Sequence, residues 1–219
     1  MNEIELDFQR EERQGFPELV YGEYKTAEQI SEIIQQHREK GANCLVTRIQ
    51  PEKVEMVLRD HPDAEHDSLA RMVSLTLKDP KRRPGHLGVI SAGTSDVPVV
   101  RECVQTAEFL GYRVTAFNDV GVAGIHRLQR RLPDLEDCDV LICVAGFEGA
   151  LPSVLAGLVR QPVIGVPTSV GYGVSDDGRA ALHAMLCSCA TGLTVTNIDN
   201  GCGAVMAACR ILETFKGAE

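Results

Sequence analysis

The stretch from Gly88 to Asp96, GVISAGTSD, joins a short apolar run to a turn of hydroxyls, glycine and a carboxylate. The run predicts a buried strand, and Pro98 opens a helical pattern directly after the turn. A strand, turn and helix in this order present backbone N–H groups, hydroxyls and a helix N-terminus to one point, which suits a phosphate or another anion. A well-capped turn, with Ser95 or Asp96 as the N-cap, explains the same residues equally well.

The elements around this turn alternate between strand and helix from residue 87 onward. Predicted strands are Leu87–Ser91, Arg113–Phe117, Asp139–Ala145, Val163–Val166 and Leu193–Ile198. Predicted helices are Val97–Leu110, Ile125–Leu132, Ala150–Val159, Asp177–Cys187 and Ala204–Phe215. Because right-handed crossovers favour this order, the pattern predicts an α/β fold with a doubly wound parallel sheet between two helix layers.

The carboxyl ends of such strands share one edge, where ligands of doubly wound sheets bind. The five loops predicted at this edge are GTSD, NDVGVAG, AGFEGALP, PTSVGYG and NIDNGCG. Their glycines and small polar residues permit close backbone approach to a ligand, which favours a nucleotide. Short turns that need glycine for their own geometry are the structural alternative.

The first part of the chain predicts a smaller α+β domain. A helix starts at Thr26 and ends at Gly41, and a second helix spans Pro51–Asp60. The segments Cys44–Ile49 and Leu69–Leu77 have strand patterns. A polar stretch rich in proline and basic residues, KDPKRRPGH at 78–86, is the best boundary, so we divide the chain into domains 1–84 and 85–219.

Composition narrows the class of protein. The 219-residue chain has 44% hydrophobic residues and a net charge of -9, and it lacks a basic tail, so we expect no nucleic-acid partner. We also expect no membrane span and a cytoplasmic location, because no apolar run approaches about 20 residues and the N-terminus is acidic. The eight cysteines lie in apolar settings without a CxxC pair, which argues against zinc and disulfides.

The order GVISAGTSD, AGFEGALPSVLAGL, PVIGVPTS and NIDNGCGA resembles the PurE-like fold of aminoimidazole ribonucleotide carboxylases and mutases. The match is closer to a sister family, LarB, since YGEYKTAEQI and VTRIQPE also resemble the LarB N-terminal region. LarB proteins are pyridinium-3,5-biscarboxylic acid mononucleotide synthases, which begin the biosynthesis of the nickel-pincer nucleotide cofactor. The resemblance covers nearly the whole chain.

One difference from PurE concerns the catalytic loop. PurE proteins have AGGAAHLPG, with a catalytic histidine before Leu-Pro, whereas AGFEGALPS here has Ala150 at that place and Glu148 two residues earlier. The segment CSCATG at 187–192 is similar to the LarB segment SCASG, with Cys189 at the matching cysteine. The resemblance therefore implies a thiol and a carboxylate in place of an imidazole.

The reaction that the resemblance implies is carboxylation of the pyridinium ring of nicotinic acid adenine dinucleotide, with phosphoanhydride hydrolysis and AMP release. Cys189 is the expected nucleophile, which would add to the ring and make its fifth carbon reactive toward carbon dioxide or bicarbonate. Glu148 is the expected general base. A buried helix-end cysteine and a helix-start carboxylate are the structural alternatives.

The same loops supply the expected substrate contacts. Candidates for phosphate, ribose and ring binding are Ser91, Gly93, Thr94, Ser95, Asp96, Asp119, Gly146, Thr168, Ser169, Tyr172, Asn197, Asp199 and Asn200. An Asx-turn explains NIDNG almost as well, and Asp96 could bond a hydroxyl or cap its helix. Lys25 and Arg48 would reach the anionic substrate if the N-terminal domain folds over the site, although surface solvation is their default role.

Three further expectations complete the hypothesis. A Mg²⁺ ion would suit the pyrophosphate, but no carboxylate cluster demands one, so no protein metal site is expected. PurE-like proteins form octamers, which implies a homo-oligomer. Two other functions stay open: a PurE-type carboxylase or mutase of purine biosynthesis, and a nucleotide-binding module without catalysis.

Overall fold

The computed structural model describes residues 4–214, which include all but the ends of two compact units, Met1–Lys81 and Arg82–Glu219. We describe each unit by itself. The predicted end of the last helix, Phe215, lies outside the described residues. Among residues 4–214, no helix is both long and apolar enough to cross a membrane.

The second unit is built on a five-stranded sheet in which every pair of neighbours is parallel. Its strands are β5 (His86–Ser91), β6 (Arg113–Phe117), β7 (Val140–Ala145), β8 (Val163–Pro167) and β9 (Thr194–Val195). The order β6-β5-β7-β8-β9 is that of flavodoxin-like sheets, with the strand order reversing between β5 and β7. The predicted fold class is confirmed.

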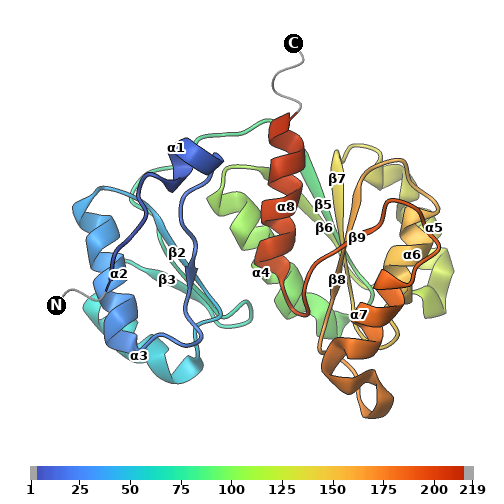
Figure 1. The fold of residues 1–219 in the computed structure, drawn as a ribbon, viewed down its shortest axis with the longest axis horizontal. Helices are drawn as coiled ribbons and strands as arrows, with labels where there is room; N and C mark the ends of the chain where they lie inside the picture. The colour runs from blue at the N-terminus through green and yellow to red at the C-terminus, as the bar shows by residue number, and fades with distance from the viewer. Residues whose placement is uncertain (1–3, 215–219) are drawn as a thin grey trace. The chain divides into compact units, whose positions relative to one another are not determined.

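Helices cover both faces of this sheet, which gives three layers (Figure 1). They are α4 (Val97–Phe109), α5 (Ile125–Leu135), α6 (Ala150–Ala156), α7 (Arg179–Leu186) and α8 (Gly201–Thr214). Helices α4 and α8 pack together on one face, and α6 and α7 pack together on the other.

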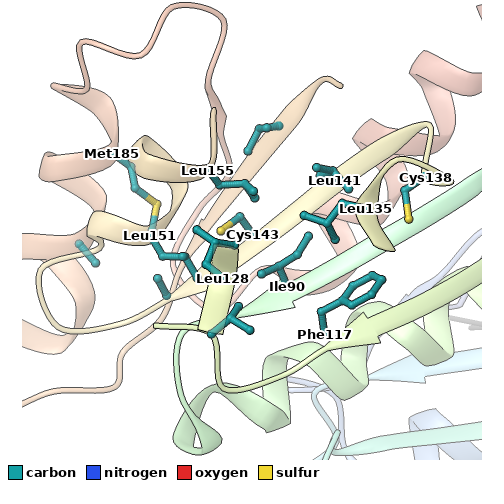
Figure 2. Packing of buried hydrophobic residues seen from close by; sticks show 14 residues of the cluster. Ile90, Phe117, Leu128, Leu135, Cys138, Leu141, Cys143, Leu151, Leu155 and Met185 are labelled. Carbon is teal, nitrogen blue, oxygen red and sulfur yellow. The ribbon is translucent and has the colours of Figure 1, made fainter. Parts of the chain in front are cut away.

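The central strand β7 explains why the sheet needs two helix layers. All six of its residues, VLICVA, are buried, as expected of a strand covered on both faces. On the face covered by α5, α6 and α7, Leu128 and Leu155 lie near Cys143 and Ile90, and Met185 lies beside Leu151 in the same cluster (Figure 2). Each buried side chain of this size stabilises the fold by about 1.5–3 kcal/mol, so the strands hold their loops at a fixed edge.

Two predicted elements near the C-terminal end are too long. Strand β9 pairs only at Thr194 and Val195, because the chain then turns toward Asp199, whose backbone is left-handed. Helix α7 begins at Arg179 rather than Asp177, since Asp176 and Asp177 also have left-handed backbones within the 3-10 segment Gly173–Gly178.

The first unit has a mixed four-stranded sheet of order β1-β2-β4-β3. Its elements are α1 (Arg10–Gln14), β1 (Val20–Tyr21), α2 (Ala27–Glu39), β2 (Cys44–Thr47), α3 (Pro51–Asp60), β3 (Glu65–Asp67) and β4 (Met72–Leu75). The predicted capping box forms: Thr26 Oγ1 accepts from Gln29 N–H, and Gln29 Oε1 accepts from Thr26 N–H. Strands β1 and β3 are too short for the sequence pattern to predict.

Candidate active site

The loops that follow the strands of the second unit are joined to one another through their backbones. Directly after β5, Ala92 N–H donates to Val144 C=O near the end of β7 at 3.0 Å. Beyond β7 and β8, Phe147 N–H donates to Val170 C=O at 2.8 Å. These bonds extend the parallel ladder into the loops, so the carboxyl edge is an ordered surface.

Asp96 is the point where three of these loops meet. Its carboxylate is 3% exposed and accepts hydrogen bonds from Thr168 Oγ1 at 2.8 Å and from Gly93 N–H at 2.9 Å. The Gly146 N–H is a third donor. Burial raises the pKa of the Asp96 carboxyl above its ordinary value, and these hydrogen bonds oppose that shift.

This geometry argues against the capping role considered for Asp96. It stands at the N-cap position of α4, but its side chain makes no capping bond to that helix. Its oxygens instead hold the loops after β5, β7 and β8 together, so Asp96 is placed to organise the edge. The exposed side chains of this turn are those of Thr94 and Ser95, which remain available to an anion.

Ser91, a candidate substrate contact, is buried and not exposed at the carboxyl edge. Its side chain is fully buried, and its hydroxyl donates to Asn118 Oδ1 at 3.1 Å in the loop after β6. Asp119, the next residue, forms an ion pair with Arg127 of α5 at 2.6 Å. Both groups therefore have partners within the unit, and neither Asn118 nor Arg127 was singled out from the sequence.

Backbone strain is concentrated at the same edge. Within the described part of the second unit, the non-glycine residues with positive φ all lie in loops that follow strands: Asp119, Phe147, Asp176, Asp177 and Asp199. Each such conformation costs about 1–3 kcal/mol and persists only where the surroundings impose it. Strain of this kind gathers at binding and catalytic sites, which favours this edge as the functional one.

Glu148 lies exposed in the loop after β7, between Phe147 and Gly149. Gly149 has a left-handed backbone at the start of α6, where a Cβ would come within 2.9 Å of the Ala181 backbone. Gly146 is equally constrained, because a Cβ there would lie 2.5 Å from Val170 C=O. The loop that carries the candidate base is therefore fixed on both sides of Glu148.

Cys189 lies three residues beyond the end of α7 and is exposed. The adjacent Ser188 hydroxyl accepts from Ser153 Oγ of α6 at 2.7 Å. Ser153 is five residues after Glu148, so this contact joins the segment of Cys189 to the helix that follows Glu148. The structure does not place Cys189 beside Asp96, since α7 begins at the carboxyl edge against Gly149 and runs away from it.

The exposure of Cys189 separates it from most other cysteines. Cys44, Cys103, Cys138, Cys143 and Cys209 are buried, whereas Cys187 and Cys189 are exposed. Burial raises the pKa of the Cys44 thiol to about 12 and that of Cys138 to about 11, which keeps these thiols protonated and unreactive.

The remaining candidates divide between contact and support. Asp199 Oδ1 accepts from Ser169 N–H at 2.8 Å, which joins the loops after β8 and β9. Asn200 Oδ1 accepts from Gly203 N–H at 2.9 Å, so it caps the start of α8. Ser169, Asn197 and Tyr172 are exposed at the edge, where they remain predicted substrate contacts.

Lys25 and Arg48 lie in the first unit, in loops that follow the parallel strands β1 and β2. Arg48 has a left-handed backbone, and its guanidinium lies 3.9 Å from Glu23 Oε2 and 5.9 Å from the Tyr21 ring centroid. Their contact with substrate stays a prediction.

Residues 4–214 contain no group of three His, Cys, Asp or Glu side chains placed to hold a metal ion.

Comparisons with known proteins divide the chain into two family matches. Residues 1–78 match the LarB/PurE-like N-terminal domain, and residues 86–218 match AIR carboxylase. An uncharacterised protein of Methanocaldococcus jannaschii is 41% identical over 92% of this chain and 80% of its own length.

Two more distant relatives cover a smaller share of this chain. The N5-carboxyaminoimidazole ribonucleotide mutase of Pyrococcus horikoshii is 30% identical over 58% of this chain and 71% of its own. The phosphoribosylaminoimidazole carboxylase of Schizosaccharomyces pombe is 31% identical over 65% of this chain but only 26% of its own. With both domains matched in order, the chain belongs to the LarB family, in which a LarB-type N-terminal domain precedes a PurE-like AIR carboxylase domain.

Proposed function

We propose that the protein carboxylates the pyridinium ring of nicotinic acid adenine dinucleotide at its fifth position and hydrolyses the phosphoanhydride with release of AMP. The product, pyridinium-3,5-biscarboxylic acid mononucleotide, is the first intermediate of nickel-pincer nucleotide biosynthesis. The observation that supports the proposal is that the loop after β7 has an exposed Glu148 and no histidine before its Leu-Pro, while the Cys189 thiol is exposed after α7, on a segment that contacts α6 through Ser188 and Ser153.

The chemistry begins with the thiolate, because an electron-poor ring cannot attack carbon dioxide. Addition of Cys189 Sγ to the fourth ring carbon moves an electron pair onto the ring nitrogen and gives a neutral enamine. Its fifth carbon then attacks carbon dioxide, and a new C–C bond forms. Glu148 takes the proton from that carbon. Expulsion of the thiolate restores the aromatic cation, so one carbon dioxide is gained and one proton is lost.

Substrate binding follows from the carboxyl edge. The exposed Thr94 and Ser95 hydroxyls, at the turn that precedes α4, suit the phosphates. Asp96 and Thr168 hold this turn against the neighbouring loops rather than contact the ligand. A Mg²⁺ ion, if required, would enter with the substrate pyrophosphate.

The direct test compares two substrates. Purified protein is incubated with bicarbonate and Mg²⁺ and with either nicotinic acid adenine dinucleotide or aminoimidazole ribonucleotide, and the products are separated by mass. We expect AMP and a dicarboxylated pyridinium mononucleotide from the first substrate and no carboxylation of the second. Carboxylated aminoimidazole ribonucleotide instead would assign the protein to purine synthesis, as the mutase relatives suggest. Binding without turnover of either would leave a non-catalytic nucleotide module.

A further inference from the structure

Phe147 and Tyr172 form an exposed aromatic pair at the carboxyl edge of the second unit. Phe147 is 48% exposed and Tyr172 is 83% exposed, although large apolar surfaces usually turn inward. Their ring centroids lie 5.8 Å apart at an interplanar angle of 87°. In this T-shaped arrangement the edge of one ring points at the face of the other, and the two rings form a corner whose remaining surfaces are exposed to solvent.

The backbone holds both rings in this position. Phe147 has φ of +52°, a conformation that a bulky residue adopts only under constraint. Its N–H is fixed to Val170 C=O, and a Cβ on Gly171 would lie 3.6 Å from Phe147 Cα, so the two loops touch along their backbones. The corner is therefore a built feature of the loops after β7 and β8.

The electrostatics of the corner suit a flat cation. Aromatic faces carry negative potential and bind cations, and rings set around a cation form the aromatic cages that recognise quaternary nitrogen. Glu148 follows Phe147 directly, and the exposed Asp176 and Asp177 follow Tyr172 in the segment Gly173–Gly178. Of these carboxylates, Asp176 lies 3.7 Å from Arg179.

We propose that Phe147 and Tyr172 bind the positively charged ring of the substrate and select a pyridinium over a neutral ring. This inference rests on the proposed function, and it adds the residues that determine specificity. It places the ring beside Glu148, where its proton must be removed. The rings act by binding and not as catalytic groups.

The test measures binding of nicotinic acid adenine dinucleotide and of its reduced form, whose ring nitrogen carries no positive charge while its ring carboxylate and its phosphates are the same. Titration calorimetry is done without bicarbonate in a Cys189→Ser background, which removes covalent capture. We expect Phe147→Leu and Tyr172→Leu each to weaken binding of the oxidised dinucleotide about 5-fold and to change binding of the reduced form less than about 2-fold.

Two controls separate the aromatic ring from other effects. Tyr172→Phe keeps the ring and should bind both dinucleotides as the parent does. Leu158→Ala removes another exposed apolar side chain of the same unit and should leave the ratio of the two affinities unchanged.

Each other outcome has a defined meaning. Equal weakening of both dinucleotides, or no weakening, would overturn the inference while turnover of the wild-type protein still supports the proposed function. A changed molecular mass of Phe147→Leu or Tyr172→Leu in solution would also overturn it, since the rings would then be a subunit contact. If the leucine variants lose the preference for the oxidised dinucleotide but the wild-type protein carboxylates no dinucleotide, the binding role of the two rings would stand and the proposed reaction would be wrong.

Discussion

At the residue scale, the candidate site separates groups that react from groups that hold the site in place. Cys189 and Glu148 are exposed, and Ser188, next to Cys189, is bonded to Ser153 of the helix that follows Glu148. Asp96 and Thr168 are buried and bonded to each other, as supporting groups usually are. Substitution of a reacting residue should therefore lower activity, whereas substitution of a supporting residue should lower stability.

Substitution of Cys189 tests the reacting group. Cys189→Ser should lower carboxylation by about 10³-fold or more, because a serine hydroxyl is not ionised at neutral pH. Turnover is measured by AMP and mononucleotide release, with folding checked by circular dichroism. Cys187→Ser is the matched control, since it removes the other fully exposed thiol, and it should retain activity within about 2-fold. Equal loss in both variants would contradict a specific role for Cys189.

Substitution of Thr168 tests the supporting group. Thr168→Val removes the hydroxyl donor to Asp96 while keeping the shape, so a buried carboxylate oxygen loses a partner. We expect a loss of about 1–3 kcal/mol in the free energy of unfolding, measured with urea. Thr168→Ser keeps the donor and should lose much less. Equal losses of stability in Thr168→Val and Thr168→Ser would show that Thr168 stabilises the fold by packing and not by this hydrogen bond.

At the element scale, the sequence was informative where hydrophobic period and turn chemistry agree. The strand 113–117 and the helix 51–60 have their predicted bounds, and Thr26 caps α2 as its pattern indicated. Errors fall where tertiary contacts decide. Strand β9 ends after Val195 because the loop after it is joined to β8 through Asp199 N–H and Pro167 C=O at 2.8 Å.

The candidate site shows the same division between local and long-range information. Motif letters pointed to Glu148 and Cys189, but they could not show that Asp96 is buried or that Ser91 bonds Asn118. Those facts depend on loops that are distant in sequence and adjacent in the sheet. The aromatic corner was missed for the same reason, since only the fold brings Phe147 to Tyr172.

Helix α2 carries a pH-dependent contribution to the stability of the first unit. His37 is buried, and its Nδ1–H donates to Ile33 C=O at 2.9 Å. Desolvation lowers the pKa of His37 below its ordinary value of 6.5. As pH falls below 6.5, the unfolded chain gains a proton that the folded chain does not, so stability declines until the folded pKa is reached.

The measurement is the free energy of unfolding of the full chain between pH 7 and pH 5. The His37 contribution should lower the free energy of unfolding toward pH 5 by at most about 1.4 kcal/mol per pH unit, and His37→Gln should remove it. His126→Gln changes an exposed histidine and should keep the slope of the parent. An unchanged slope in His37→Gln would contradict the assignment.

At the scale of the whole molecule, the two units of the chain match two different family descriptions. The second unit has the fold and loops of the AIR carboxylase family, and the first unit brings Lys25 and Arg48 on its own loops. The resemblance to PurE-like proteins implies assembly, so we expect an octamer of the 23.8 kDa chain in sedimentation. An active monomer would contradict that expectation and leave the proposed reaction intact.

The most direct test of the proposed reaction follows the carbon atom. The protein is incubated with nicotinic acid adenine dinucleotide, Mg²⁺ and ¹³C-labelled bicarbonate, and each product is examined by mass spectrometry. Our account predicts the label in a pyridinium dicarboxylate mononucleotide, one AMP for each such molecule, and neither product with Cys189→Ser. AMP release with an unlabelled ring would contradict it, because the protein would then be a pyrophosphatase and not a carboxylase.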